Sequence, residues 1–271
     1  MECKNANTLK LTIRFLLVEL WLDQILSLRE PRKRLQAVEE MTKSIPNSLS
    51  EIYKGLLGRI DEIDRDLAFR IFSWLFRAQR ILRMEELLEA LVVEEGDKDL
   101  ELECLLEPSY VIKCCNGLVL YEESSGSVRF SHVTVYDYFK TNIDILPTSA
   151  HLAKSCLTYL SFDVFKQPCS GRDSIEERVQ RYRFGLYAAQ FWRFHAKEAE
   201  EYREVQETVV SCFTMKGRRD TVLQMEVYAK SNGHHTSFVQ GKGLIHLLAE
   251  TGLCETSRFV LANDQGKKEA G

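Results

Sequence analysis

Apolar residues recur every three to four positions along most of this chain, which predicts a succession of amphipathic helices. In the first half the helical pattern covers residues 9–28, 32–43, 49–60, 62–77, 84–93 and 108–115. In the second half it covers residues 133–141, 149–161, 174–199, 200–215 and 219–230. We therefore expect a mainly α protein.

One stretch has the alternation of a β-hairpin instead. Leu118–Glu122 and Val128–Phe130 alternate like paired strands, and Ser124-Ser125-Gly126 supplies a turn in which glycine can take a positive φ. Asn116-Gly117 just before the first strand is typical of a helix end. This hairpin is the one clear β signal in the sequence.

Several predicted helices begin with recognisable residues. Pro108 suits the first position of a helix, and Glu85 suits a first turn, where the helix dipole favours acids. Ser48 with Glu51 three residues later forms a capping-box pattern. Thr148 or Ser149 is expected to cap the helix that follows.

The order of elements suggests four segments. Residues 1–45 form a helical segment, and residues 46–145 hold three helices, the hairpin and a further helix, the order of a winged-helix domain. Residues 146–235 are expected to form a helical bundle. Residues 236–271 hold two short helices meeting at a glycine turn and a polar tail, and Leu-Ile-His-x-x-Ala within them matches the ankyrin-repeat pattern.

Composition adds little to this picture. The 271 residues are 45% apolar and 28% charged, as in ordinary globular proteins, and the formal charge of −4 creates no global attraction to nucleic acid or an anionic membrane. Lys10, Arg14, Glu19 and Asp23 interrupt the apolar segment 9–28, so we expect it to pack against protein rather than span a bilayer.

The eight cysteines form no CxxC pair and have no zinc-site spacing, so no metal site is expected. Cys114-Cys115 lies on an apolar helical pattern, and buried reduced thiols are the simplest interpretation. Without a recognisable secretory signal, this cysteine usage points to a reducing, cytoplasmic compartment.

Signatures of catalysis are missing from the sequence. It has no Gly-x-Ser-x-Gly, no HExxH and no glycine-rich dinucleotide loop, so we predict no enzyme activity, no catalytic residue and no cofactor. Cysteine–histidine pairs that meet only in space stay open at this point. The aromatic run over 182–194 is expected to be helix core rather than a ligand pocket.

A winged helix can bind nucleic acid, and this is the alternative function. Lysine and arginine contacts to phosphate would then provide much of the affinity. The would-be recognition helix, 108–115, offers only Lys113, and residues 85–107 hold ten acids against one lysine. A second basic cluster, at Arg172, Arg178, Arg181 and Arg183, is expected to be a solvated helix face beside an aromatic core.

Short motifs in a fixed order carry a resemblance to a known family. They are Pro46-x-Ser48-Leu49-x-x-Ile52-Tyr53, Trp74-Leu75, Leu82-x-x-Glu85-Glu86-Leu87-x-x-Ala90-Leu91, Cys115-x-Gly117-Leu118-Val119 and Val128-x-Phe130-x-His132-x-Thr134-Val135-x-x-Tyr138-Phe139. This order resembles the winged-helix region, also called the GPI inositol-deacylase-type winged helix, that follows the NACHT ATPase in fungal NACHT–ankyrin proteins of the NLR-like STAND class. Residues 16–26 are similar to the end of the NACHT module, and residues 187–196 are similar to the helical region after the winged helix.

The resemblance implies a non-catalytic regulatory fragment that couples a NACHT ATPase module, expected upstream, to ankyrin repeats. No Gly-x-x-x-x-Gly-Lys-Ser/Thr loop occurs here, so the nucleotide site itself is expected elsewhere. Ankyrin-like and helical surfaces would bind protein partners, with no role for nucleic acid or membrane.

The resemblance also singles out one residue. In related NLR proteins a histidine at the end of the wing contacts the β-phosphate of bound ADP, and His132 occupies the matching place. An imidazole there would sense the nucleotide in the intact protein. Two simpler roles stay open for His132: capping of the helix that begins at Val133, and packing on Phe130. His246 is expected to be an ankyrin-type structural histidine bonded to backbone.

Overall fold

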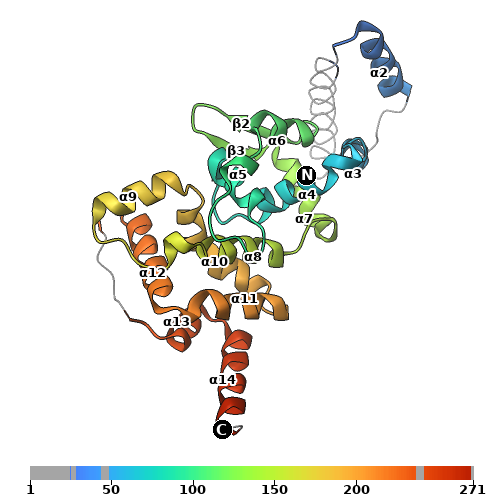
Figure 1. Ribbon diagram of the computed structural model, residues 1–271. Coiled ribbons are helices and arrows are strands. Elements are labelled where there is room, and N and C mark those ends of the chain that lie inside the picture. Colours follow the sequence, from blue (N-terminus) through green and yellow to red (C-terminus); the bar gives the residue numbers. More distant parts are fainter. Residues whose placement is uncertain (1–24, 26–28, 44–48, 236–240, 270–271) are drawn as a thin grey trace, which may run out of the picture. The chain divides into compact units, whose positions relative to one another are not determined.

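The computed structural model describes residues 25, 29–43, 49–235 and 241–269 (Figure 1). The helix predicted over 9–28 falls outside these residues apart from Ile25, and so does the predicted capping residue Ser48. The chain divides into two compact units. Unit 1 comprises the described residues up to Phe76 together with Glu107–Leu146, and unit 2 comprises Arg77–Leu106 and the described residues from Pro147 onward. The four segments proposed from the sequence stay a prediction.

Unit 1 is helical apart from one hairpin. Its elements are α2 (Pro31–Lys43), α3 (Leu49–Gly58), α4 (Glu62–Arg77, whose last residue belongs to unit 2), α6 (Pro108–Cys114), β2 (Val119–Glu122), β3 (Ser127–Phe130), α7 (Val133–Thr141) and the short 3-10 helix η2 (Ile143–Ile145). The mainly α fold with a hairpin, as predicted, is confirmed.

The hairpin forms where the alternation placed it. β2 and β3 pair antiparallel, with Val119 opposite Phe130 and Glu122 opposite Ser127. Gly126 has φ +67°, the left-handed conformation that the turn requires. Asn116 and Gly117 also have positive φ, and the Asn116 side-chain amide donates to the Leu56 carbonyl at 2.9 Å. The end of α6 is thereby attached to α3.

Aromatic side chains from three elements fill the core of unit 1. Phe72 of α4 and Phe139 of α7 are fully buried with ring centroids 5.2 Å apart, and Phe130 of β3 lies 5.5 Å from Phe139. Tyr53 of α3 packs against Tyr138 of α7, with centroids 5.3 Å apart. Offset and tilted aromatic pairs of this kind add to the free energy of area burial, so α3, α4, the hairpin and α7 share one core.

Unit 2 holds the remaining elements. They are β1 (Leu82–Arg83), α5 (Met84–Val92), η1 (Leu102–Cys104), α8 (Ser149–Leu160), η3 (Asp163–Phe165), α9 (Arg172–Arg181), α10 (Gly185–Glu198), α11 (Arg203–Thr214), α12 (Lys216–Lys230), α13 (Leu244–Thr251) and α14 (Cys254–Glu269). The two-residue strand β1 was not predicted. Thr148 is the residue before α8, but its side chain makes no capping hydrogen bond.

The single long helix predicted over 174–199 is wrong: the chain forms α9 and α10 with a break at Tyr182–Phe184. Both aromatic side chains turn into the core, where Tyr182 is 4% and Phe184 0% exposed. The Phe184 amide donates to Glu89 Oε2 at 2.9 Å instead of continuing the helical ladder. An interaction with a residue of α5 therefore replaces the local helical pattern.

Glu89 is the buried carboxylate around which this core forms. It is 5% exposed, and the same oxygen, Oε2, accepts the Tyr159 hydroxyl at 2.5 Å as well as the Phe184 amide. Burial raises the pKa of the Glu89 carboxyl, and the two hydrogen bonds oppose that shift only in part. Tyr159 in turn packs edge-on against Phe184, with centroids 5.2 Å apart.

Other aromatic side chains of the run 182–194 pack α10 against neighbouring helices, α11 among them. Tyr187 and Trp192 are buried, and Trp192 lies 4.4 Å from Phe213 of α11 between ring centroids. The prediction that residues 182–194 form helix core is confirmed for these side chains, whereas Phe194 is 43% exposed.

A helix pair follows α12. Gly252 joins α13 to α14 with φ +71° and ψ 24°, so the predicted glycine turn is confirmed. Leu247 and Leu248 of α13 and Val260 of α14 are buried, and the two helices pack against each other and against α11. α14 is longer than predicted and continues to Glu269.

We predict that Glu89→Leu lowers the free energy of unfolding of unit 2 by about 3 kcal/mol, because two buried donors lose their acceptor. Glu89→Gln retains an acceptor oxygen and is expected to cost about 1 kcal/mol or less. Urea denaturation of the whole chain, followed by tryptophan fluorescence, measures both values. Equal losses for the two variants would contradict the assigned role.

The sign of the pH dependence follows from the raised pKa of Glu89. The folded protein holds this proton more tightly than the unfolded chain, so the stabilisation is present at low pH and is lost as the pH rises through the folded pKa. From pH 7 down to about pH 4.5, the wild type should therefore gain stability relative to Glu89→Gln. A difference that stays constant over this range would contradict the assignment.

Candidate functional site

The sequence singled out His132, which lies between the hairpin and α7 in unit 1. Its backbone is extended, and it is the residue that caps α7. The ring Nδ1 accepts the Thr134 amide at 3.2 Å and lies 2.7 Å from the Thr134 hydroxyl oxygen. That hydroxyl is also 2.6 Å from the Tyr53 hydroxyl of α3, so the cap is tied into the core of unit 1.

This geometry supplies the capping role that the sequence left open. A ring whose Nδ1 accepts a hydrogen bond carries its proton on Nε2 when neutral. Nε2 has no hydrogen-bond partner among the described residues, and the side chain is partly exposed. His132 can therefore cap α7 and still present one donor outward, which leaves the phosphate-sensing role a prediction.

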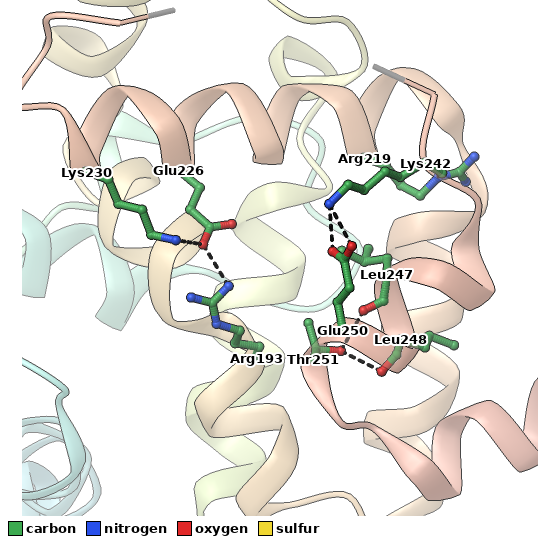
Figure 2. A network of polar contacts seen from close by, with 9 residues as sticks. All are labelled: Arg193, Arg219, Glu226, Lys230, Lys242, Leu247, Leu248, Glu250 and Thr251. Atoms are coloured by element: carbon green, nitrogen blue, oxygen red, sulfur yellow. Dashed lines mark hydrogen bonds and ion pairs between the residues drawn. The ribbon is translucent and has the colours of Figure 1, made fainter. Parts of the chain in front are cut away.

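A second feature is the attachment of the helix pair to α12, near the Lys242–Glu250 ion pair drawn in Figure 2. Arg219 Nε donates to the Lys242 carbonyl at 2.8 Å, and Asp220 accepts the Gly241 amide at 2.8 Å. The Lys242 ammonium lies 2.7 Å from Glu250 of α13. Side chains from α12 thus fix the backbone that leads into α13.

The start of α14 is held by Glu200, an acid between α10 and α11. The Glu200 carboxylate accepts the buried Thr256 amide at 3.1 Å and pairs with Lys197 at 2.7 Å. Lys197 also donates to the Gly252 carbonyl at 2.5 Å, and the Arg203 guanidinium lies 3.7 Å from the Phe259 ring centroid. A negative charge at a helix N-terminus is favourable because it interacts with the positive end of the helix dipole.

A further ion-pair cluster joins α10 to α12 (Figure 2). Glu226 accepts from Arg193 and from Lys230, each at 2.7 Å, and only 12% of its side chain is exposed. Partly buried networks of this kind are screened less than surface pairs. α10, α11, α12 and the helix pair are therefore connected by charged side chains as well as by apolar packing.

His195 is a fully buried titratable group outside these clusters. Its Nε2 lies 2.9 Å from the Tyr187 hydroxyl, which also accepts the Gln79 amide at 3.1 Å. Burial, with a smaller contribution from Arg77, lowers the pKa of His195 to about 4. The ring is neutral at physiological pH and serves as a core hydrogen-bonding group.

The cysteines among the described residues are free thiols. Cys114, Cys115, Cys156 and Cys212 are buried as expected, and burial raises the pKa of Cys212 to about 11. Cys104 and Cys254 are exposed, against the expectation. Within the described ranges, no three histidine, cysteine or acidic side chains are arranged to hold a metal ion, and no helix is long and apolar enough to cross a membrane.

The arginines around α9 are engaged locally. The Arg178 guanidinium lies 5.8 Å from the Phe165 ring centroid and donates to the Gln167 carbonyl. Arg172 pairs with Glu176 at 2.7 Å, and Arg181 lies over the Tyr182 ring. These contacts agree with the predicted helix face beside an aromatic core.

Of the two histidines named from the sequence, His132 belongs to unit 1 and His246 to unit 2. His246 is exposed on α13 and makes no hydrogen bond to backbone among the described residues, against the expectation. Sequence reasoning missed Glu200, for which the only signal was an acid at the first position of the helix predicted over 200–215.

Comparisons with known proteins add one distant likeness. A curated protein of Monascus ruber, "Azaphilone pigments biosynthesis cluster protein L", is 25% identical over 179 residues, which cover 59% of this chain. The match spans 37% of that protein's length. No family model matches the chain, and no solved structure matches it. The family resemblance drawn from the motifs therefore stays a proposal.

We predict that His132→Ala lowers the free energy of unfolding of unit 1 by about 1 kcal/mol, because α7 loses its cap. His132→Asn supplies a side-chain oxygen at the same place and should recover most of that loss. Chemical denaturation of the three proteins measures the difference. An alanine variant as stable as the wild type would exclude the capping role.

We predict that Glu200→Ala loosens α14 while leaving the rest of unit 2 folded. The buried Thr256 amide then lacks an acceptor, which costs about 2 kcal/mol locally. Limited trypsin digestion should cut faster after Arg258 of α14 in this variant. Glu201→Ala removes an exposed neighbouring acid and is the matched control; equal cleavage of both variants would refute the anchor.

Proposed function

We propose that this chain is a non-catalytic regulatory and interaction fragment of a NACHT–ankyrin, NLR-like signalling protein. In this proposal the winged-helix segment packs on an ATPase module located upstream, and the helical segment passes the change of state to ankyrin repeats. The observation that carries the proposal is the ordered set of motifs ending in a helix pair with an ankyrin-like sequence.

The attachment of the helix pair supports the relay. A segment that transmits motion must move as one piece, because a loose joint would absorb the displacement. Arg219 and Asp220 of α12 bond the backbone that leads into α13, and Lys197 at the end of α10 and Glu200 after it bond backbone groups at the turn and start of α14. Such contacts fix direction as well as distance.

In this proposal, His132 is the residue that senses the phosphate of the bound nucleotide. It caps α7 through Nδ1 and keeps Nε2 as an outward donor, which is the arrangement a phosphate contact would need. In the intact protein, loss of that phosphate would release the contact without removing the cap. We place the protein in the cytoplasm, with protein partners on its ankyrin-like and helical surfaces.

The alternative function is nucleic-acid binding by the winged helix. Against it, Tyr110 of the would-be recognition helix α6 donates to Asp64, so an acid lies beside that helix. Lys113 is the single lysine or arginine on α6. Phosphate contacts need several such side chains on one face.

We predict that the purified chain shows no saturable binding of ATP or ADP, because it has no Walker A loop. Fluorescent ADP titrated against the chain, with an established P-loop protein as positive control, measures this. The coding sequence upstream should encode a Walker A loop within a few hundred residues. Nucleotide binding by the chain alone, or an upstream region without that loop, would refute the proposal.

A further inference from the structure

A pocket of about 700 Å³ opens in unit 2 between α8, α11 and the turn after α5. Sites for small molecules commonly enclose about 300–1,000 Å³. Four carboxylates line it, those of Glu95, Asp97, Glu204 and Glu207, against a single ammonium, that of Lys154. Its described lining holds no aromatic or aliphatic side chain, so the pocket suits a small, polar and positively charged ligand.

The walls of this pocket are held in place by hydrogen bonds. Asp97 accepts the Glu94 amide at 2.8 Å, which closes the turn, and Gly96 within it has φ +100°. The Lys98 carbonyl accepts the Asp163 amide at 2.8 Å, which ties the same turn to the segment after α8. The carboxylates are therefore presented by a fixed loop and two helices.

Lys154 shows that these walls stabilise an ammonium group. Its Nζ lies 2.6 Å from Glu204 and 3.5 Å from Glu95, and the hydrogen bond to Glu204 raises the pKa of Lys154. Asp97 and Glu207 then provide charge for a further cation. Glu207 pairs with Arg203 at 2.9 Å, but both side chains are more than half exposed, where solvent weakens such a pair.

An unbonded hydroxyl in the pocket wall is the second, independent observation. Thr158 of α8 is 8% exposed and lines the pocket, yet its hydroxyl makes no hydrogen bond to any described residue. The two nearby hydroxyls of Ser161 and Thr208 instead bond to carbonyls of their own helices, at 2.8 and 2.7 Å. The Thr158 hydroxyl lines the pocket with both lone pairs unused, so it can accept a hydrogen bond from a ligand N–H.

We propose that this pocket binds a small alkyl polyamine. Its ammonium groups would lie between the carboxylates of Asp97, Glu204 and Glu207, and one N–H would donate to the Thr158 hydroxyl. The four carboxylates exclude anionic ligands such as nucleotides. This inference does not rest on the proposed regulatory function, because its residues belong to none of the contacts used there.

Titration of the whole chain with spermidine by isothermal calorimetry tests the site. We expect one saturable site, weakened about tenfold by Thr158→Val and by Asp97→Asn, since each loses a hydrogen bond or charge at an ammonium. The Asp97→Asn variant can keep the bond to the Glu94 amide. Glu123→Gln removes an exposed acid of the hairpin turn in unit 1 and should leave the affinity unchanged.

Three results would overturn the proposal. The first is the absence of saturable heat with spermidine. The second is equal competition by Mg²⁺ at matched ionic strength, or equal weakening in Glu123→Gln, either of which would indicate a diffuse counterion effect. The third is tighter binding of a lysine-rich peptide than of spermidine, which would assign the pocket to a protein partner. Thermal melting shows whether each variant is folded as the wild type is.

Discussion

A single buried carboxylate oxygen organises unit 2. Glu89 Oε2 accepts the Tyr159 hydroxyl from α8 and the Phe184 amide from the start of α10, so three elements meet at one acceptor. An unsatisfied donor in this core would cost about 1–3 kcal/mol, which is a large fraction of ordinary domain stability. Phe184 immediately precedes α10, so this contact fixes the point at which the helix begins.

The direction of α10 decides where the later contacts can form. α10 carries Arg193 toward Glu226 of α12, and its end presents Lys197 beside Glu200 and the Gly252 carbonyl. Glu200 then accepts the Thr256 amide in the first turn of α14. A chain of polar contacts therefore runs from the buried acid of α5 to the helix pair, and each contact is directional where apolar packing alone would allow sliding.

Local signals explain what the sequence predicted correctly. Helix periodicity, the turn at Gly126 and the helix end at Asn116-Gly117 depend on neighbouring residues alone, and the structure has all three. The break at Tyr182–Phe184 was missed because its cause is Glu89, 95 positions away from Phe184. The two-residue strand β1 is too short for a period to appear.

The candidate sites also divide into those formed by neighbouring residues and those formed by residues far apart in the sequence. The cap by His132 involves Thr134, two residues away, and was one of the roles weighed from the sequence. The anchor at Glu200 joins residues 56 positions apart, and the acidic pocket takes its walls from three separate stretches of chain. No periodicity or motif links such residues, since only the packing of α8, α10 and α11 brings them together.

Native-state hydrogen exchange at two amides tests the account most directly. The Phe184 amide reports the bond to Glu89, and the Thr256 amide reports the bond to Glu200. If unit 2 and its helix pair move as one piece, both amides should exchange only through the same large opening, with equal free energies. A Thr256 amide that exchanges as fast as the exposed turn at 124–126, while Phe184 stays protected, would contradict it.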